Sequence, residues 1–297
     1  MHLEPLAQLV TREIGKPIAE ARGEVQEIVD TCNFFVGEGR RLYGHTVPSE
    51  MADKQLFTFR NPVGVAAIIT AGNFPVAVPA WYLVPAILCG NAVVWKPAEY
   101  SPALGDAMVK IFHAGGVPGG VLNLVQADGA TTFAGLEQAL DKGLVDKVGF
   151  TGSSAVGSKI GELCGRHLQS PCLELGGKNP MVIMDDADIA LAVEGALFGG
   201  FGTAGQRCTS LGTAIVHESI HDEFVSTIWP SNWPKPNAGA TSCVRRVCAR
   251  SVRRSSAGWH CSASSGSPTG PRSSPSSTRR TSGPEPSPNA CGMWSDR

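Results

Sequence analysis

The last 72 residues of this 297-residue sequence lack the side chains from which a hydrophobic core is built. From Ser226 onward there is no Leu and no Phe, the last Ile is Ile228, and Ser, Arg and Pro dominate. A segment of this composition cannot bury enough apolar surface to offset the entropy that it loses on ordering. We therefore predict a disordered tail over residues 226–297. Its sequence has no helical or strand periodicity, which favours the hypothesis that it is translated from a shifted reading frame.

An excess of charge of either sign is also missing from the chain as a whole, because its net charge is −1. That balance hides a tail of +8 and a body of −9. A basic, Ser-rich tail is one known form of a nucleic-acid or membrane-surface arm. The reading-frame hypothesis needs no such partner, so we expect binding neither to nucleic acid nor to a membrane.

Signals for export, membrane insertion and disulfide formation are missing too. Residues 1–27 carry charges throughout and contain no apolar stretch of the signal-peptide kind. The apolar run 76–89 has 14 residues with two prolines, which fits a buried helix better than a membrane span. The nine cysteines show no paired spacing. We expect a cytoplasmic protein with reduced thiols.

Strand-like and helix-like patterns alternate regularly after Pro62. β-branched apolar runs predict strands, and apolar residues at helical spacing predict the helices that follow them. The predicted strands cover 63–70, 92–95, 121–125 and 145–150, and the predicted helices cover 104–114 and 132–140 and begin at Val76 and Ser153. This order indicates an α/β fold with a doubly wound parallel sheet.

The patterns divide the chain into four segments. Residues 1–62 hold N-terminal helices, broken at 15–17, and an extended strand region, and residues 63–175 form a dinucleotide-binding domain. Residues 176–225 begin a second α/β catalytic domain, and the tail completes the chain. Within the third segment we expect strands at 181–184 and 213–216 around a helix at 189–201.

Three residue types that one reaction requires occur in separate short motifs. Asn73 lies in Asn-Phe-Pro, Glu174 in Leu-Glu-Leu-Gly-Gly-Lys, and Cys208 in Gly-Gln-Arg-Cys-Thr. An amide donor, a carboxylate and a thiol are the groups that take an aldehyde through a thioester to an acid. The three motifs in this order are more informative than any one residue.

Each of these residues also has an ordinary structural interpretation. Cys208 follows residues with little bulk, which suits a thiol that meets a ligand, whereas most free cysteines are buried and inert. Glu174 stands among apolar residues, where burial would raise its pKa and suit it to act as a base, or else it is a paired structural carboxylate. Asn73 is otherwise a turn residue before Phe74 and Pro75.

A glycine-rich turn over 152–157 ends the fourth predicted strand and opens a helix. Backbone N–H groups and the helix dipole there can face a phosphate, although a plain glycine-rich turn has the same pattern. Ser158 and Lys159 stand where a P-loop requires Lys and then Ser or Thr, so the turn is not a P-loop. Asn73 follows the first strand and Lys96 the second, so these groups are expected at one edge of the sheet.

Two further motifs match known patterns in the wrong context. Residues 200–205 match the dinucleotide fingerprint literally, but helical sequence precedes them, so we interpret them as a flexible loop that delivers Cys208. His217 and His221 match the zinc motif of metalloproteases, but a predicted strand runs directly into His217 and the next helix is expected to begin near Ser219 as its cap. We therefore predict no metal site.

Together the motifs resemble the NAD(P)-dependent aldehyde dehydrogenase superfamily, and residues 95–99 and 150–153 add to the resemblance. It implies that Cys208 is the nucleophile, that the Asn73 amide and the Cys208 N–H hold the oxyanion, and that Glu174 activates the hydrolytic water. It also implies NAD as the cofactor, with NADP as the alternative. The cofactor site that the resemblance implies comprises Lys96, Glu99, Gly152, Ser153, Ser154, Ala155, Val156, Gly157 and Leu175.

The chain departs from the family pattern beside Asn73 and at both ends. Many members have Trp where this chain has Gly72. The family's chains begin earlier, and neither its Glu motif for the nicotinamide ribose nor its final oligomer-pairing strand is readable after Val225. Residues 45–60 resemble the dimer-contact strands of a family that forms homo-oligomers. We expect a truncated member that is inactive or impaired alone.

Two alternatives stay open. An acylating member would pass the thioester to coenzyme A, although such members typically lack the base that Glu174 resembles. A non-catalytic nucleotide-binding fragment would keep only the cofactor site. The context of Cys208 is similar to that of the semialdehyde-oxidising branch, and Glu99 near the ribose would repel a 2′-phosphate, which favours NAD.

Overall fold

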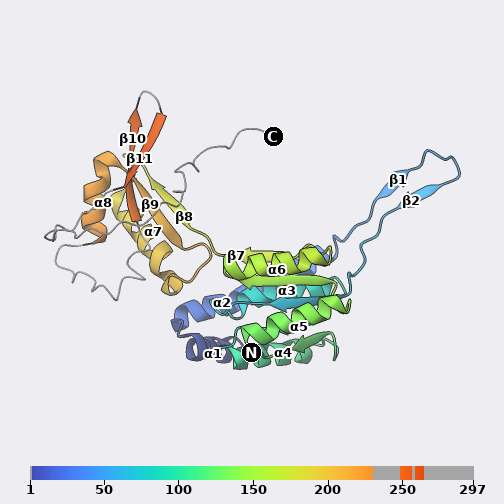
Figure 1. The fold of residues 1–297 in the computed structure, drawn as a ribbon. Coiled ribbons are helices and arrows are strands. Elements are labelled where there is room, and N and C mark those ends of the chain that lie inside the picture. The colour runs from blue at the N-terminus through green and yellow to red at the C-terminus, as the bar shows by residue number, and fades with distance from the viewer. Residues whose placement is uncertain (1, 230–247, 256–257, 264–297) are drawn as a thin grey trace, which may run out of the picture. The chain divides into compact units, whose positions relative to one another are not determined.

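The computed structural model describes residues 2–229, 248–255 and 258–263 (Figure 1). The chain forms two compact units, Met1–Ala263 and Ser264–Arg297, and the second lies outside the described residues. Within the described part, no helix combines the length and the apolar character that crossing a bilayer requires. All the elements described below belong to the first unit.

Helices α1 (Leu3–Ile14) and α2 (Ile18–Gly39) open the chain. Helix α1 ends at Gly15, whose left-handed φ of 74° lets its N–H bond to the Thr11 carbonyl. The chain then passes Pro17 into α2, so the break lies where the sequence predicts it. Strands β1 (Thr46–Pro48) and β2 (Gln55–Phe57) follow as an antiparallel pair of exposed residues.

A five-stranded parallel sheet with the order β5-β4-β3-β6-β7 forms the centre of this unit. Its strands are β3 (Val65–Ile69), β4 (Ala92–Lys96), β5 (Leu122–Leu124), β6 (Lys147–Gly152) and β7 (Cys172–Leu175). Its helices are α3 (Ala77–Leu88), α4 (Pro102–Ala114), α5 (Gly129–Asp141) and α6 (Ser154–Arg166). The predicted α/β class is confirmed, although β7 was not predicted.

Successive residues of β3 enter two different cores, as the alternation of side chains along a strand requires. Ala66 and Ile68 belong to a core shared with α1 to α4, and Ala67 belongs to a second core shared with α5 and α6. Helices therefore cover both faces of the sheet, which is why its central strand β3 is apolar throughout. Trp95 is fully buried in the first core and donates its indole N–H to Thr70 Oγ1 at 3.0 Å.

A second sheet of four strands has the order β11-β10-β9-β8. Its strands are β8 (Asn179–Ile183), β9 (Leu211–His217), β10 (Cys248–Ser255) and β11 (Gly258–Ala263). The first three run parallel, and β11 is antiparallel to β10. Helices α7 (Ile189–Phe201) and α8 (His221–Ile228) pack with β8 and β9 around the fully buried Phe224. Elements β8, α7 and β9 correspond to the elements predicted for this segment.

The described part of the predicted tail contains regular structure. Helix α8 continues to Ile228, beyond the predicted boundary at Val225, and β10 and β11 extend the second sheet. Strand β10 forms backbone hydrogen bonds with β9, which lies far away in the sequence. The composition of the tail contains no signal for such a pairing, so the prediction missed it. Residues 230–247, 256–257 and 264–297 lie outside the described residues, as does the prediction for them.

The turn into β3 requires glycine at position 64. Gly64 has a φ of +124°, and a Cβ there would lie 2.1 Å from Asp146 Oδ2. That oxygen accepts the Val65 N–H at 2.8 Å. We predict that Gly64→Ala lowers the free energy of unfolding by about 2 kcal/mol or more, because backbone strain adds to a disturbed hydrogen bond.

Urea denaturation measures this effect, with Gly135→Ala as its control. A Cβ at Gly135, inside α5, meets nothing within 4 Å. That substitution should raise the free energy of unfolding by about 1 kcal/mol, because Ala favours a helix more than Gly does. Effects of the same sign and size at both positions would contradict the claim that the turn into β3 requires glycine at position 64.

Candidate active site

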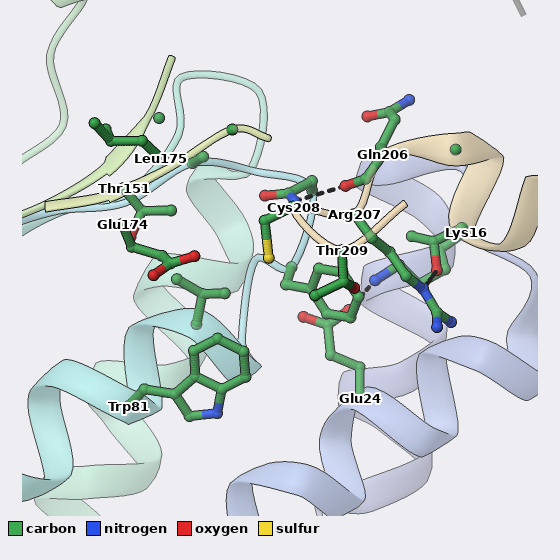
Figure 2. A pocket seen from close by; sticks show the side chains of 18 of the residues that line it. Lys16, Glu24, Trp81, Thr151, Glu174, Leu175, Gln206, Arg207, Cys208 and Thr209 are labelled. Atoms are coloured by element: carbon green, nitrogen blue, oxygen red, sulfur yellow. Dashed lines mark hydrogen bonds and ion pairs between the residues drawn. The ribbon is translucent and has the colours of Figure 1, made fainter. Parts of the chain in front are cut away.

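Asn73, Glu174 and Cys208 line one cavity of about 670 Å³ (Figure 2). Asn73 lies between β3 and α3, Glu174 lies in β7, and Cys208 lies in the turn between α7 and β9. Figure 2 shows the Glu174 carboxylate and the Cys208 sulfur turned towards each other. The three residues that the motifs single out are therefore neighbours in the fold.

The pKa of the Cys208 thiol is raised above its ordinary value. Burial of the thiol contributes most, and the charge of Glu174 and a hydrogen bond with Glu174 raise the pKa further. Backbone hydrogen bonds with Thr209 and Cys208 act in the opposite direction with smaller effect. At neutral pH Cys208 therefore rests as a thiol that is hydrogen-bonded with Glu174.

Glu174 is exposed, so the expectation that it is buried is wrong. Strand β7 forms one edge of the five-stranded sheet, and Cys172, Leu173 and Glu174 are all exposed along it. An edge strand has a neighbouring strand on one side only, and this removes the covering that an apolar sequence context suggested. The exposed position leaves the carboxylate open to water.

The Asn73 side chain joins its own loop to the turn that carries Cys208. Its Nδ2 donates to the Gln206 carbonyl oxygen at 2.6 Å, and a primary amide carries a second N–H on the same nitrogen. Its Oδ1 is buried and has no hydrogen-bond partner among the described residues. The side chain thus links two distant loops, which is more than the local turn role that was the alternative requires.

Three consecutive residues with a left-handed backbone shape the turn before Cys208. Thr203, Ala204 and Gly205 have φ values of 54°, 53° and 67°. The first two are uncommon conformations for residues that carry a Cβ. Helix α7, rather than a strand, runs into this turn, so residues 200–205 are not a dinucleotide fingerprint.

Helix α2 supplies a wall of the cavity that the sequence analysis did not predict. Glu20, Glu24 and Glu27 line the cavity together with Lys16 from the preceding turn. Burial raises the pKa of Glu27 most, followed by the charge of Glu24. In the sequence, only the spacing of these carboxylates on one helix face could have indicated this wall. The backbone groups that Glu24 and Glu20 contact lie 52 and 183 residues away.

A second cavity of about 360 Å³ contains much of the cofactor site that the resemblance implies. Lys96, Glu99, Gly152, Ser153 and Val156 line it. The Lys96 Nζ lies 3.9 Å from Glu99 Oε1. Burial lowers the pKa of Lys96, and the charges of Glu99 and Asp128 partly oppose this. The cavity therefore offers a cation, a carboxylate and the start of α6 to a ligand.

The other residues implied for the cofactor site have different positions. Ser154 and Ala155 lie in the first turn of α6 but do not line the second cavity. Leu175 instead lines the cavity that contains Cys208, called the catalytic cavity below. A Cβ on Gly157 would lie 2.5 Å from Leu175 Cδ2, so this glycine allows α6 to pack closely on β7. Ser153 caps α6 by accepting the Val156 N–H at 3.3 Å.

Tyr100 occupies the space beside Asn73 that Gly72 leaves open. A Cβ on Gly72 would lie 2.3 Å from Tyr100 Cε2 and 2.9 Å from Ala98 Cβ. Tyr100 lines both cavities. A side chain at position 72 would therefore meet an aromatic ring from another loop, a contact that could not be predicted from the sequence.

The zinc motif is divided between different elements. His217 ends β9 and caps a short 3₁₀ turn (Glu218–Ile220), and His221 begins α8. The helix thus begins at His221 rather than near Ser219. Among the described residues, no group of His, Cys, Asp and Glu could hold a metal ion.

Beside the parallel sheet, one cavity is thus lined by a cysteine and a carboxylate, and the second cavity by a lysine, a carboxylate and the start of a helix. The profile of the Aldehyde dehydrogenase family matches residues 1–230. The chain belongs to the aldehyde dehydrogenase family.

Similarity to individual members covers the same part of the chain. Aldehyde dehydrogenase family 7 member B4 of Arabidopsis thaliana is 39% identical over 234 residues, covering 77% of this chain and 45% of that protein. The NADP(+) succinate-semialdehyde dehydrogenase GabD of Escherichia coli (strain K12) is 39% identical over 227 residues, covering 76% and 46%. The solved structure of betaine aldehyde dehydrogenase from Staphylococcus aureus in complex with NAD+ matches with a TM-score of 0.73 and 33% identity, covering 76% and 44%. The chain spans about half the length of these relatives.

We predict that Glu174→Gln lowers the pKa of Cys208, because it removes a neighbouring negative charge while the burial of the thiol remains. Alkylation of Cys208 by iodoacetamide at about pH 7 should therefore accelerate roughly threefold to tenfold, since the thiolate is the reactive form. Peptide mass spectrometry across a pH series measures the midpoint. Cys32, on α2, serves as the internal control and should not change, and an unaltered midpoint at Cys208 would count against the contact.

We predict that Gly72→Ala lowers the free energy of unfolding by about 1 kcal/mol, because the new Cβ displaces the Tyr100 ring and presses on Ala98. Tyr100→Ala in the same chain should recover about half of this loss, since it removes one of the two clashes. A double-mutant cycle by urea denaturation measures the coupling. Strictly additive effects would show that the two residues do not pack together.

Proposed function

We propose that this chain catalyses the NAD(P)+-dependent oxidation of an aldehyde to a carboxylic acid. The observation that carries the proposal is that Cys208, Glu174 and Asn73 share one cavity, next to a second cavity lined by Lys96 and Glu99. Membership of the aldehyde dehydrogenase family supports the same reaction.

Cys208 acts as the nucleophile in this proposal. The thiol loses its proton to solvent, and the thiolate attacks the aldehyde carbon. The Asn73 amide, held by the Gln206 carbonyl, and the Cys208 backbone N–H then stabilise the developing oxyanion. The product of this step is a thiohemiacetal on Cys208.

The second cavity fits a dinucleotide by the chemistry of its lining. The capped start of α6 offers backbone N–H groups to a phosphate, and Lys96 and Glu99 offer polar contacts to a ribose. Bound NAD+ supplies the hydride acceptor through which the thiohemiacetal becomes a thioester. The Glu99 carboxylate would repel a 2′-phosphate, which supports NAD over NADP.

The exposed position of Glu174 supports hydrolysis of the thioester by water. A carboxylate that faces both Cys208 and solvent can activate a water molecule beside the thioester carbon. The same residue argues against transfer of the acyl group to coenzyme A. Nucleotide binding alone does not require the contact between Glu174 and Cys208, so this contact favours catalysis over a non-catalytic fragment.

A semialdehyde is the substrate class that the relatives support. The names of relatives from Escherichia coli and Bacillus subtilis specify succinate semialdehyde and alpha-ketoglutaric semialdehyde. We propose succinate semialdehyde as the first substrate to test.

We predict that the purified full chain reduces NAD+ when succinate semialdehyde is added, and that Cys208→Ser abolishes this reduction. Glu174→Gln should give one equivalent of NADH and then stop, because the Cys208 thiolate forms without the Glu174 carboxylate and the thioester is not hydrolysed. Absorbance of NADH follows both phases. The impaired turnover that the resemblance implies would appear as a low rate of NADH formation from the first turnover onward.

Product analysis with and without coenzyme A separates the alternatives. Free acid as the product in both cases is the expected result. Turnover that survives Cys208→Ser, or acyl-coenzyme A as the main product, would contradict the proposed reaction.

A further inference from the structure

Two carboxylates on one face of α2 hold the two loops that carry the proposed oxyanion donors. Glu20 and Glu24 stand four residues apart, so they project from the same side of the helix. Glu24 reaches the start of α3, next to Asn73, and Glu20 reaches the turn before Cys208. Neither residue has a part in the reaction steps proposed above.

Glu24 caps helix α3 from outside that helix. Its Oε1 accepts the N–H of Val76 at 2.9 Å and the N–H of Ala77 at 3.2 Å. The N-cap position of α3 is Val76, which has no side chain able to satisfy these first N–H groups. The start of α3, and with it the loop of Asn73, is thereby tied to α2.

Lys16 completes this arrangement. Its ammonium pairs with Glu24 Oε2, and both side chains are 1% exposed. A buried charge is strongly unfavourable unless it is paired. Removal of either Lys16 or Glu24 alone would therefore leave an unpaired buried charge and destabilise the fold. The Lys16 Nζ also lies 3.8 Å from the centroid of the Phe74 ring, and this cation–π contact holds the residue next to Asn73.

Glu20 holds the second loop. Its Oε1 accepts the N–H of Thr203 at 3.2 Å, and Thr203 is one of the two residues with a Cβ that adopt a left-handed backbone there. Thr203 Oγ1 in turn accepts from Arg207 Nε at 3.0 Å. Glu20 Oε2 is buried without a hydrogen-bond partner among the described residues. Such an unfavourable arrangement commonly marks a position retained for function.

We infer that Glu20 and Glu24 are positioning residues, which together set the separation between the Asn73 amide and the Cys208 N–H. The inference rests on the proposed function, because that function assigns these two donors to one oxyanion. The two loops already meet through the bond from Asn73 to Gln206. Helix α2 supplies the rigid element that fixes both of them.

The test compares two reactions of Cys208 in the full chain, neither of which uses NAD+ or an aldehyde. With 4-nitrophenyl acetate, the thiolate attacks the ester carbonyl, a thioester forms, and 4-nitrophenolate leaves with the bonding electrons while the thiol proton passes to buffer. This reaction develops an oxyanion, whereas alkylation by iodoacetamide does not. Peptide mass spectrometry follows the alkylation of Cys208, and absorbance follows the initial release of 4-nitrophenolate that Cys208→Ser abolishes. The ratio of the two rates therefore reports on the oxyanion donors, and the thiolate fraction cancels.

Asn73→Ala provides the reference for the loss of one donor and should lower the ratio about 100-fold. We expect Glu20→Leu and Glu24→Leu each to lower it about tenfold, because the donors remain but are misplaced. Glu20→Gln should recover the ratio, since its amide oxygen still accepts the Thr203 N–H. The double variant Lys16→Met/Glu24→Gln should recover most of it, since it keeps an acceptor for α3 and leaves no unpaired buried charge, although the cation–π contact with Phe74 is lost.

Glu13 offers a matched control. Its two carboxylate oxygens accept the N–H groups of Ala103 at 3.0 Å and Leu104 at 2.9 Å, so it caps α4 from outside as Glu24 caps α3. Glu13 does not line the catalytic cavity. Glu13→Leu should therefore lower stability and leave the ratio within about twofold of its original value.

The inference is overturned if Glu20→Leu and Glu24→Leu change the ratio no more than Glu13→Leu does. It is also overturned if Cys208 of the unaltered chain is alkylated but the chain releases 4-nitrophenolate no faster than Cys208→Ser does. If Glu24→Leu does not fold, the comparison of Glu20→Leu with Glu20→Gln decides. Absence of NADH with the predicted ratios contradicts the proposed oxidation alone, and NADH formation with unchanged ratios contradicts the positioning role alone.

Discussion

The hydrogen bond from Asn73 Nδ2 to the Gln206 carbonyl, 2.6 Å long, joins segments that lie 133 residues apart. It places the loop after β3 beside the turn before β9, and the proposed chemistry depends on that meeting. An amide, a thiol and a carboxylate carry out acyl chemistry only when they surround the same carbonyl carbon. The left-handed backbone at Thr203 and Ala204 is the strained part of the turn that makes this approach.

The charged groups of the site differ in exposure, in line with the roles proposed for them. Glu174 is exposed at the edge of the five-stranded sheet, where water can reach it, and its charge helps to keep Cys208 protonated at rest. Lys16 and Glu24 are buried as a pair, and Glu24 accepts backbone N–H groups at the start of α3. A reactive group must be open to its reactants, whereas a group that fixes geometry is most effective when its surroundings hold it in one conformation.

The α/β order and most central elements could be predicted from the sequence, because strands such as β3 and helices such as α5 carry their periodicity locally. Strand β7 escaped prediction because it is short, contains Glu174 and is followed by two glycines. Cys208, Glu174 and Asn73 could be singled out because each lies in a distinctive motif. The roles of Glu24 and Glu20 could not, because their hydrogen bonds span 52 and 183 residues and leave no local pattern.

The most direct test of the account is to trap the acyl group on the enzyme. The Glu174→Gln variant is treated with NAD+ and succinate semialdehyde, quenched in acid, and mapped cysteine by cysteine with mass spectrometry. The account predicts an acyl adduct on Cys208 and none on Cys89 or Cys172. NADH formation with no adduct on Cys208, or with the adduct on another cysteine, would contradict the claim that Cys208, Glu174 and Asn73 act on one carbonyl carbon.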